Sequence, residues 1–287
     1  MAAVAWQSLL SGLAQGLLYA LLASGFALIF GVGRTFNLAH GELVILGGYV
    51  AYWLQQWVGL DPLLSIPVAL LLGGLAGVLL QRAAAWVREP FELNALVLTF
   101  GTALVLQSLM QNLWTANYRL VVPYFSGSVE LVGARLSLAQ LAGAATGLVG
   151  WGALTWVLTW TTFGRGLRAA SQDRNGASLV GISPEHMDVW AFALGAAAAT
   201  AAGPLFALMH LLSPSAGLNI TVIALTISVL GGVGRMGAVL AAALFIGVVE
   251  ALTVGVVGTP WRGIVLFGLL LVLLRLRAPA LPGGVEA

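Results

Sequence analysis

The sequence contains no cysteine and no lysine, although it has 287 residues and twelve basic side chains, all of them arginine. Without cysteine there can be no disulfide, no zinc–thiolate site and no iron–sulfur cluster. Without lysine there is no P-loop, whose lysine contacts the nucleotide phosphates, and no Schiff-base cofactor. The chain therefore cannot act as a Walker-type ATPase by itself.

Charged residues are also scarce. They make up 8% of the chain, against 60% hydrophobic residues and a mean hydropathy of +1.00, whereas soluble domains carry about 25% charged residues. Too few charges are present to cover a water-facing surface, so most of the chain must face lipid. Because backbone groups in hydrocarbon must be hydrogen-bonded internally, the apolar segments are expected to be helices. We therefore predict an all-α polytopic membrane protein with one transmembrane domain over residues 1–287.

Uncharged windows mark the candidate spans, each close to the roughly 20 residues that a membrane helix needs. They cover residues 6–32, 43–58, 62–81, 93–113, 137–160, 189–211, 217–234, 236–254 and 261–276. The first is expected to be a retained helix, because it lacks a basic start and exceeds the ~7–15 apolar residues of a signal peptide. Residues 217–254 could cross the membrane twice or form a re-entrant pair, so we expect eight or nine spans.

Arginine positions indicate the orientation, because cytoplasmic loops are enriched in basic residues. If the N-terminus lies outside and nine segments alternate, the inside residues are Arg34, Arg82, Arg88, Arg165, Arg168, Arg174, Arg235, Arg275 and Arg277. The outside residues are then Arg119, Arg135 and Arg262. This asymmetry predicts an external N-terminus and a cytoplasmic C-terminus.

Two connections are long enough to have a role of their own. The external loop, residues 114–136, contains aromatics, proline and glycines, which is typical of an interfacial loop. The cytoplasmic loop, residues 161–188, is expected to hold one short helix over residues 166–180, followed by a helix start at Ser183-Pro184-Glu185. The loop could be a solvated connection whose charges follow topology, or a docking helix for a cytoplasmic partner.

Residues 36–42, FNLAHGE, place three polar side chains between two charge-free runs. His40 and Glu42 are two residues apart and point to different sides of a helix, so their spacing does not support a metal site. Asn37 can act as the N-cap of a helix that begins at Leu38, by accepting the N–H of Ala39 or His40. The segment therefore predicts a break between two helices.

The first residues of the helix that follows this break agree with that interpretation. Gly41 falls in the first turn, and Glu42 lies near the positive end of the helix dipole. A proton relay through His40, Glu42 and Glu250 stays possible, as in a secondary transporter, and so does a non-transporting membrane scaffold. Neither His210 nor Glu250 can be assigned a role from the pattern.

Four segments together resemble the permease subunits of branched-chain amino acid ABC transporters. They are GLLYALLASGFALIFGVGRTFNLAHGELVILGGYVAYWL (16–54), LVLTFGTALVLQSLMQNL (96–113), FGRGLRAASQDRNGASLVGI (163–182) and ISVLGGVGRMGAVLAAALFIGVVEAL (227–252). The chain departs from the family pattern at Gln172, where an acid is common, although Asp173 follows it. Urea and short-amide permeases belong to the same superfamily, and these motifs do not separate them.

The resemblance implies a transport subunit without enzymatic activity of its own, without cofactor or metal, in the cytoplasmic (inner) membrane of a prokaryote. Its implied partners are a second, homologous permease subunit, two cytoplasmic ATP-binding subunits and an external substrate-binding protein. The fold implied is a bundle of eight to nine helices with a broken helix near residues 36–42 and a cytoplasmic coupling helix. Whether the permease pair is two copies or two different chains stays open, as does the amino acid or amide that is carried.

The resemblance also implies two sets of functional residues. The substrate pathway would be lined by Asn37, His40, Gly41, Glu42, Gly231, Gly232 and Gly234, with the break facing the half-helix around Gly231–Gly234. Coupling to the ATP-binding subunits would use Gly164, Arg165, Arg168, Asp173 and Gly181.

Overall fold

The computed structural model describes residues 2–86, 91–125, 127–131, 133–232 and 234–277. Arg88, placed inside by the arginine distribution, lies outside the described residues. The elements in chain order are α1 (Ala2–Gly33), α2 (His40–Val58), η1 (Pro62–Ser65), α3 (Ile66–Ala85), α4 (Phe91–Trp114), β1 (Ser128–Leu131), β2 (Ala134–Ser137), α5 (Leu138–Trp160), α6 (Thr162–Gln172), α7 (Arg174–Leu179), α8 (Pro184–Met209), η2 (Pro214–Ala216), α9 (Gly217–Gly231), α10 (Met236–Leu252), the π-helical turn η3 (Thr253–Val257) and α11 (Trp261–Arg277).

Within the described residues, seven helical segments are long and apolar enough to cross a membrane. They contain α1, α3, α4, α5, α8, α9 and α10. α2 is less apolar, because it begins with His40 and Glu42 and carries Gln55 and Gln56, and α11 has 17 residues. The predicted fold class, a mostly helical polytopic membrane protein, is therefore confirmed.

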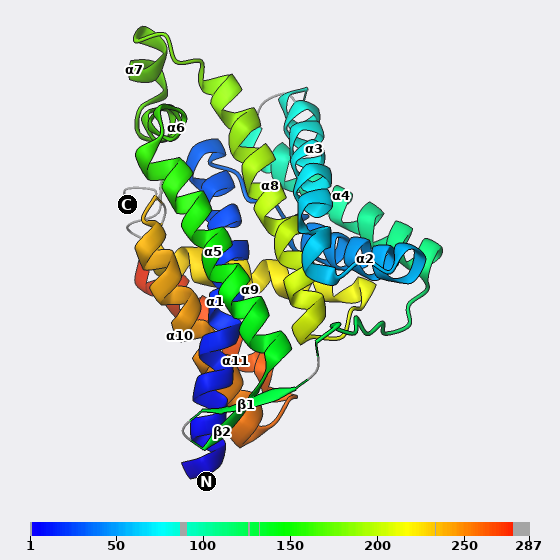
Figure 1. Ribbon diagram of the computed structural model, residues 1–287. Helices are drawn as coiled ribbons and strands as arrows, with labels where there is room; N and C mark the ends of the chain where they lie inside the picture. The colour runs from blue at the N-terminus through cyan, green and yellow to red at the C-terminus, as the bar shows by residue number, and fades with distance from the viewer. Residues whose placement is uncertain (1, 87–90, 126, 132, 233, 278–287) are drawn as a thin grey trace.

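The centre of the bundle is formed by α1 and α8, whose apolar stretches are mostly buried inside the protein. α1 packs against α5, α8, α9 and α10, and α3 packs along α8 (Figure 1). Small residues allow these helices to approach closely, which replaces the hydrophobic driving force that is missing in lipid. For example, a Cβ on Gly25 of α1 would lie about 2.5 Å from the carbonyl oxygen of Gly195 on α8.

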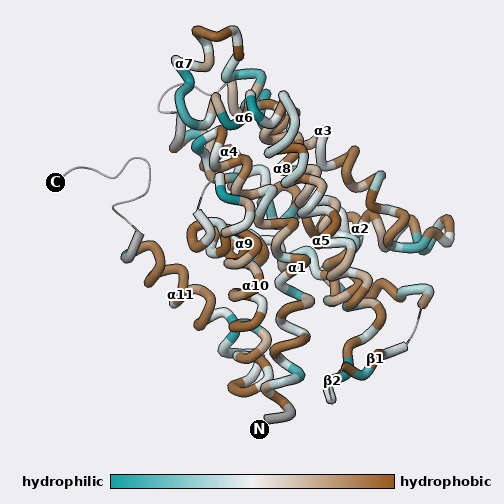
Figure 2. The backbone as a smooth tube through the Cα atoms, turned by 60° about the vertical axis from the view of Figure 1, so that its left-hand side comes forward, coloured by the Kyte–Doolittle hydropathy of each residue, from teal (hydrophilic) through white to brown (hydrophobic). Residues whose placement is uncertain are grey.

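Polar structure gathers at the two ends of the bundle. α6 and α7 lie at one end, whereas the N-terminus and the β1–β2 hairpin lie at the other (Figure 1). Figure 2 shows hydrophilic residues along α6 and α7 and mostly hydrophobic ones along α10 and α11. The long predicted loops, 114–136 and 161–188, therefore lie at opposite ends of the molecule.

The loop of residues 114–136, predicted to be external, contains regular structure that the sequence did not predict. Its last part forms the antiparallel β1–β2 hairpin, in which Val129 pairs with Leu136. Gln7 of α1 holds this hairpin, because its side chain accepts the N–H of Arg135 (2.8 Å) and donates to the Arg135 carbonyl (2.7 Å). Ser137 then starts α5 with a capping box to Gln140.

The prediction of one helix over residues 166–180 is wrong, since the segment forms two helices, α6 and α7. Asp173 leaves the helical conformation (φ −145°, ψ 105°), and its side chain accepts the N–H of Gly176 at 3.0 Å. Asp173 thus caps a new helix, as short acidic side chains often do. The predicted start of α8 is confirmed: Ser183 is its N-cap, Pro184 its first residue, and the Ser183 hydroxyl accepts the N–H of His186.

Candidate functional site: the polar break and the α6–α7 loop

The predicted helix break is present between α1 and α2, and we call residues 36–42 the polar break. α1 ends where Arg34 adopts a left-handed conformation (φ 53°). The Asn37 side chain accepts the N–H of Ala39 at 3.1 Å, as predicted. α2 begins at His40, however, rather than at Leu38. Asn37 caps a single turn that precedes the helix, since the His40 N–H bonds to the Asn37 carbonyl (3.2 Å).

Two threonines from other helices satisfy the backbone of the polar break. Thr99 of α4 accepts the N–H of Leu38 (3.3 Å) and donates to the carbonyl of Phe36 (3.2 Å). Thr221 of α9 accepts the N–H of Gly41 at 2.8 Å. Freed backbone groups within a membrane must find such partners. Sequence reasoning did not name either threonine as a site residue, although Thr99 lies in the segment 96–113 that carries the family resemblance.

Gly41 and Glu42 lie directly against the first residue of α9. A Cβ on Gly41 would overlap the carbonyl oxygen of Gly217, and a Cβ on Gly217 would overlap the Glu42 carboxyl group. Glu42 is 3% exposed, and its Oε2 has no hydrogen-bond partner among the described residues. The carboxyl group therefore lies at the N-terminal ends of both α2 and α9, where the helix dipoles favour negative charge.

His40 connects the polar break to α1. It is fully buried, and its Nε2 donates to the carbonyl of Leu22 (2.8 Å) while its ring packs edge-on against Phe26. Its Nδ1 has no partner in the part of the chain that the structure describes. The histidine thus fixes the start of α2 against α1.

The glycines at the other end of α9 are not beside the polar break. Gly231 packs against the backbone of Val239, and Gly232 and Gly234 have positive φ angles (78° and 80°). Fourteen residues separate Gly231 from Gly217, which is about 21 Å along a helix. The break faces the N-terminal end of α9 instead of its C-terminal glycines. Gly234 lines a small cavity of about 80 Å³ together with Arg168 of α6.

Glu250 belongs to a separate buried network. Its Oε1 forms an ion pair with Nε of Arg262 (2.5 Å), and its Oε2 accepts the Tyr19 hydroxyl (2.9 Å). Gln15 donates to Oε1 at 3.2 Å. These partners join α1, α10 and α11, and none of them belongs to the polar break.

Two of the predicted coupling residues build the corner between α5 and α6. The Arg168 guanidinium donates to the carbonyls of Leu158 and Thr159 at the C-terminal end of α5. A Cβ on Gly164 would overlap the carbonyls of Val157 and Leu158. These residues therefore close the corner, Gly164 because it has no Cβ and Arg168 through its bonds to the carbonyls of α5. Of the others, Arg165 is exposed, Asp173 caps α7, and Gly181 (φ 83°) follows α7.

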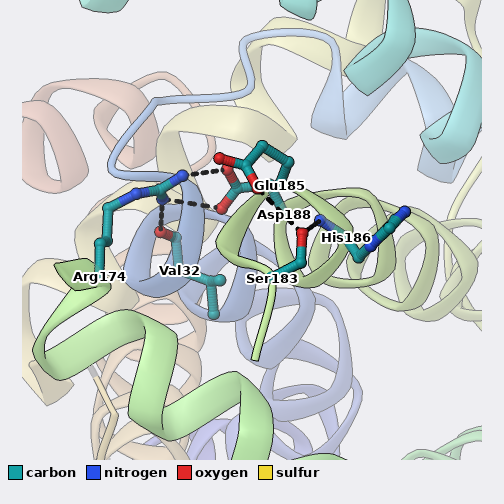
Figure 3. A network of polar contacts seen from close by, with 6 residues as sticks. All are labelled: Val32, Arg174, Ser183, Glu185, His186 and Asp188. Atoms are coloured by element: carbon teal, nitrogen blue, oxygen red, sulfur yellow. Dashed lines mark hydrogen bonds and ion pairs between the residues drawn. The ribbon is translucent and has the colours of Figure 1, made fainter. Parts of the chain in front are cut away.

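Arg174, which the sequence analysis placed only by its charge, ties this loop to two membrane helices (Figure 3). Its guanidinium binds both carboxylate oxygens of Asp188 on α8, at 3.0 and 2.7 Å, and also reaches the Val32 carbonyl at the end of α1 (3.5 Å). This bonding to Asp188 raises the pKa of Arg174 above its ordinary value. Ser171 donates to the neighbouring carbonyl of Gly31 (2.7 Å). No local pattern links Arg174 to a partner 14 residues away.

Comparison with known proteins decides the family. The family model described as "Branched-chain amino acid transport system / permease component" matches residues 8–274. The chain belongs to this family. It is 29% identical over 299 residues to the high-affinity branched-chain amino acid transport system permease protein BraD of Pseudomonas aeruginosa, and 27% identical to LivH of Salmonella typhimurium. Each match covers 98% of this chain and 96% of the relative.

More distant relatives have other names. The autoinducer 2 import system permease protein LsrC of Escherichia coli is 30% identical over 187 residues, which is 60% of this chain and 50% of LsrC. Among solved structures, PsaBC from Streptococcus pneumoniae in complex with Fab aligns with 94% of this chain and 90% of that chain, at a TM-score of 0.48 and 14% identity. That likeness is too weak to carry an argument.

Proposed function

We propose that this chain is the permease subunit of an ATP-driven importer for branched-chain or other hydrophobic amino acids, which an external binding protein delivers. The observation that carries this proposal is the family match over residues 8–274, together with relatives named for branched-chain amino acid transport that align over nearly their whole length. The chain has no lysine, so it cannot supply a P-loop. ATP hydrolysis therefore belongs to two separate cytoplasmic subunits, and a second, homologous permease subunit completes the membrane part.

The orientation that we propose has the N-terminus and the external loop outside, and α6, α7 and the C-terminus inside. It is supported by the arginine distribution and by the position of α6 and α7 at the end opposite to the N-terminus (Figure 1). In this arrangement α2 and α11 cross the membrane in addition to the seven apolar segments. The bundle would then have nine spans, with α9 and α10 as two shorter crossings.

The substrate pathway that we propose passes Asn37, His40, Gly41 and Glu42. Glu42 offers a buried carboxylate oxygen without a partner in the described chain, which suits the ammonium group of an amino acid. Two half-helix starts meet at this point, an arrangement by which transporters present polar groups to a substrate. Gly231, Gly232 and Gly234 would line the inner end of the path, where Gly234 adjoins the α6–α7 loop.

The surface that we propose for the ATP-binding subunits is the loop 161–188, with Gly164, Arg165, Arg168, Asp173 and Gly181 as its coupling residues. Leu179 and Val180, just before Gly181, are 88% and 73% exposed, which is unusual for apolar side chains outside lipid unless a partner covers them. Arg174 and Ser171 bind the loop to the last carbonyls of α1, the helix that leads into the polar break. Movement of the loop would therefore reach the break through α1.

Substitutions at two arginines of this loop distinguish a role in docking the ATP-binding subunits from a role in stabilising the fold. We expect Arg165→Glu, at an exposed position, to lower ATP-coupled uptake about tenfold while thermal stability stays unchanged, because a reversed charge repels the docking surface. Arg168→Glu should lower uptake and stability together, since it removes a charged donor from the α5 carbonyls, worth about 1.5–3 kcal/mol. Uptake, ATP hydrolysis and unfolding temperature are measured on the same preparations. Equal losses of stability in both variants would argue against the docking role of Arg165.

The substrate class is tested by competition. The assembled transporter, reconstituted with its binding protein, should take up labelled leucine, and excess unlabelled isoleucine or valine should suppress that uptake. Excess urea or acetamide should leave it unchanged. Uptake of labelled urea, with no uptake of leucine, would instead assign the chain to the urea and short-amide permeases.

A further inference from the structure

A cavity of about 700 Å³ lies beside the external loop and includes no residue of the polar break or of the α6–α7 loop in its lining. It is formed by the C-terminal end of α8, by η2, by the first half of α9 and by the first turns of α11. Tyr118 of the external loop also lines it, and the adjacent Arg119 pairs its backbone with Leu212 in the α8–η2 connection. The volume is in the range of sites that bind small molecules.

Part of the lining of this outer cavity carries hydrogen-bond donors. Arg262 and Asn219 line it, and they belong to the first turns of α11 and α9. The helix N-termini add partial positive charge at the same place. Arg262 uses its Nε for Glu250, and its terminal nitrogens have no partner within the described residues. His210 also lines the cavity, and its buried Nε2 is unpaired in the same part of the chain.

The rest of the lining is mostly apolar. It includes Phe206, Ile220, Ile223, Leu266 and Phe267. A ligand that fits the whole lining has an anionic group and an aliphatic chain on one small frame. Arginine binds a carboxylate through two parallel hydrogen bonds.

The outer cavity and the polar break lie on two sides of the same helix. Ile220 and Val222 of α9 line the cavity, while Thr221 between them accepts the N–H of Gly41 in the break. Likewise Ala216 lines the cavity, and the next residue, Gly217, lies against the Glu42 carboxyl group. Only the N-terminal half of α9 separates the two sites.

We propose that the outer cavity is a subsite of this permease that binds the α-carboxylate of the incoming amino acid through Arg262, Asn219 and His210. The aliphatic side chain lies on the apolar wall. The inference rests on the proposed function and adds to it the residues that recognise the carboxylate before the substrate passes α9. Arg262 then binds the substrate carboxylate in addition to forming its ion pair with Glu250.

Protection of an introduced cysteine from chemical labelling tests this subsite. Because the chain has no cysteine of its own, labelling of this subunit reports only the introduced residue. Ser215→Cys, or Thr259→Cys at a second lining position, is introduced into the assembled transporter in lipid nanodiscs and treated with a water-soluble thiol reagent. Leucine at ten times its Kd should slow the labelling about tenfold. Leucinamide, which lacks the carboxylate, should not. Val129→Cys, an exposed position on the hairpin, is the control and should label at the same rate with or without leucine.

Three results would overturn the subsite. They are equal protection by leucinamide, protection by the ligand-free binding protein but not by leucine, and no protection at either cysteine in a transporter that takes up leucine with ATP. In the last case the proposed function would stand and only the subsite would fall. A transporter that shows no ATP-dependent uptake of leucine would instead remove the proposed function.

Kinetics give a second, independent readout. Arg262→Lys keeps the charge beside Glu250 but loses the planar fork, so KM for leucine uptake should rise about tenfold or more while kcat changes little. A fall in kcat with unchanged KM would show that Arg262 acts only through its ion pair, and would contradict the subsite.

Discussion

Gly41→Ala should abolish leucine uptake and destabilise the protein, whereas Gly152→Ala should do neither. Alanine is a better helix former than glycine by about 1 kcal/mol, so both changes would be favourable on propensity alone. At Gly41 the new Cβ would overlap the Gly217 carbonyl oxygen, which is backbone and cannot rotate away. Overpacking typically costs about 1–3 kcal/mol, and a backbone contact places this case at or above the upper end.

Gly152 is a matched control because a Cβ there would meet nothing within 4 Å. Both glycines lie in helices, Gly41 in the first turn of α2 and Gly152 in the interior of α5, and the main difference between the two substitutions is the space around the new Cβ. The unfolding temperature of the purified protein and leucine uptake in proteoliposomes are the measurements. If Gly41→Ala kept the stability and activity of Gly152→Ala, the close contact between the polar break and α9 would be refuted.

Removing Arg174 should destabilise the α6–α7 loop and weaken coupling between ATP hydrolysis and uptake. In Arg174→Ala the Asp188 carboxylate, 6% exposed, loses its only ion-pair partner in the described chain. Breaking a fully buried pair costs about 3–5 kcal/mol and an exposed one below about 1 kcal/mol. Because the Arg174 side chain is 35% exposed, we expect about 2 kcal/mol, together with loss of the contact to the Val32 carbonyl.

The double variant Arg174→Ala/Asp188→Asn distinguishes two effects of losing Arg174. One is the unpaired Asp188 carboxylate, and the other is the missing contact between the loop and α1. It should recover most of the stability, because no unpaired carboxylate remains, yet uptake per ATP hydrolysed should stay low, because the loop is still detached from α1. Unfolding temperature and the ratio of leucine uptake to ATP hydrolysis give the two quantities. Full recovery of that ratio would show that the connection to α1 plays no part in coupling.

The positions of the long helices could be predicted because hydrocarbon excludes charge, and uncharged windows therefore follow the helices closely. The same rule explains why the uncharged window at α8 is too short, although the capping pattern at Ser183-Pro184-Glu185 placed the helix start correctly. The window began at residue 189, whereas the helix begins at Pro184, since Glu185 and Asp188 were treated as loop residues. Asp188 is tolerated inside the bundle because Arg174 neutralises it. Such compensation joins two elements and leaves no trace in a local window.

The polar break illustrates the same limit at the candidate site. The Asn37 hydrogen bond to Ala39 is local, so residue type and spacing predicted it. The helix start moved from Leu38 to His40 because Asn37 caps a separate turn, which is a choice between two short-range geometries. The contacts of Gly41 with Gly217 and Thr221 join residues about 180 positions apart, and nothing along the chain specifies them.

We propose that transport through this chain is driven by ATP hydrolysis on partner subunits, and uptake under two different energy sources distinguishes this from proton coupling. Leucine uptake is followed in proteoliposomes that contain the assembled transporter, with the binding protein outside and either ATP inside without a pH gradient, or an imposed pH gradient without ATP. We expect uptake only with ATP, because Glu250 is bound by Arg262, Tyr19 and Gln15, none of which belongs to the polar break. Uptake driven by the pH gradient alone, and unaffected by ATP, would contradict this proposal.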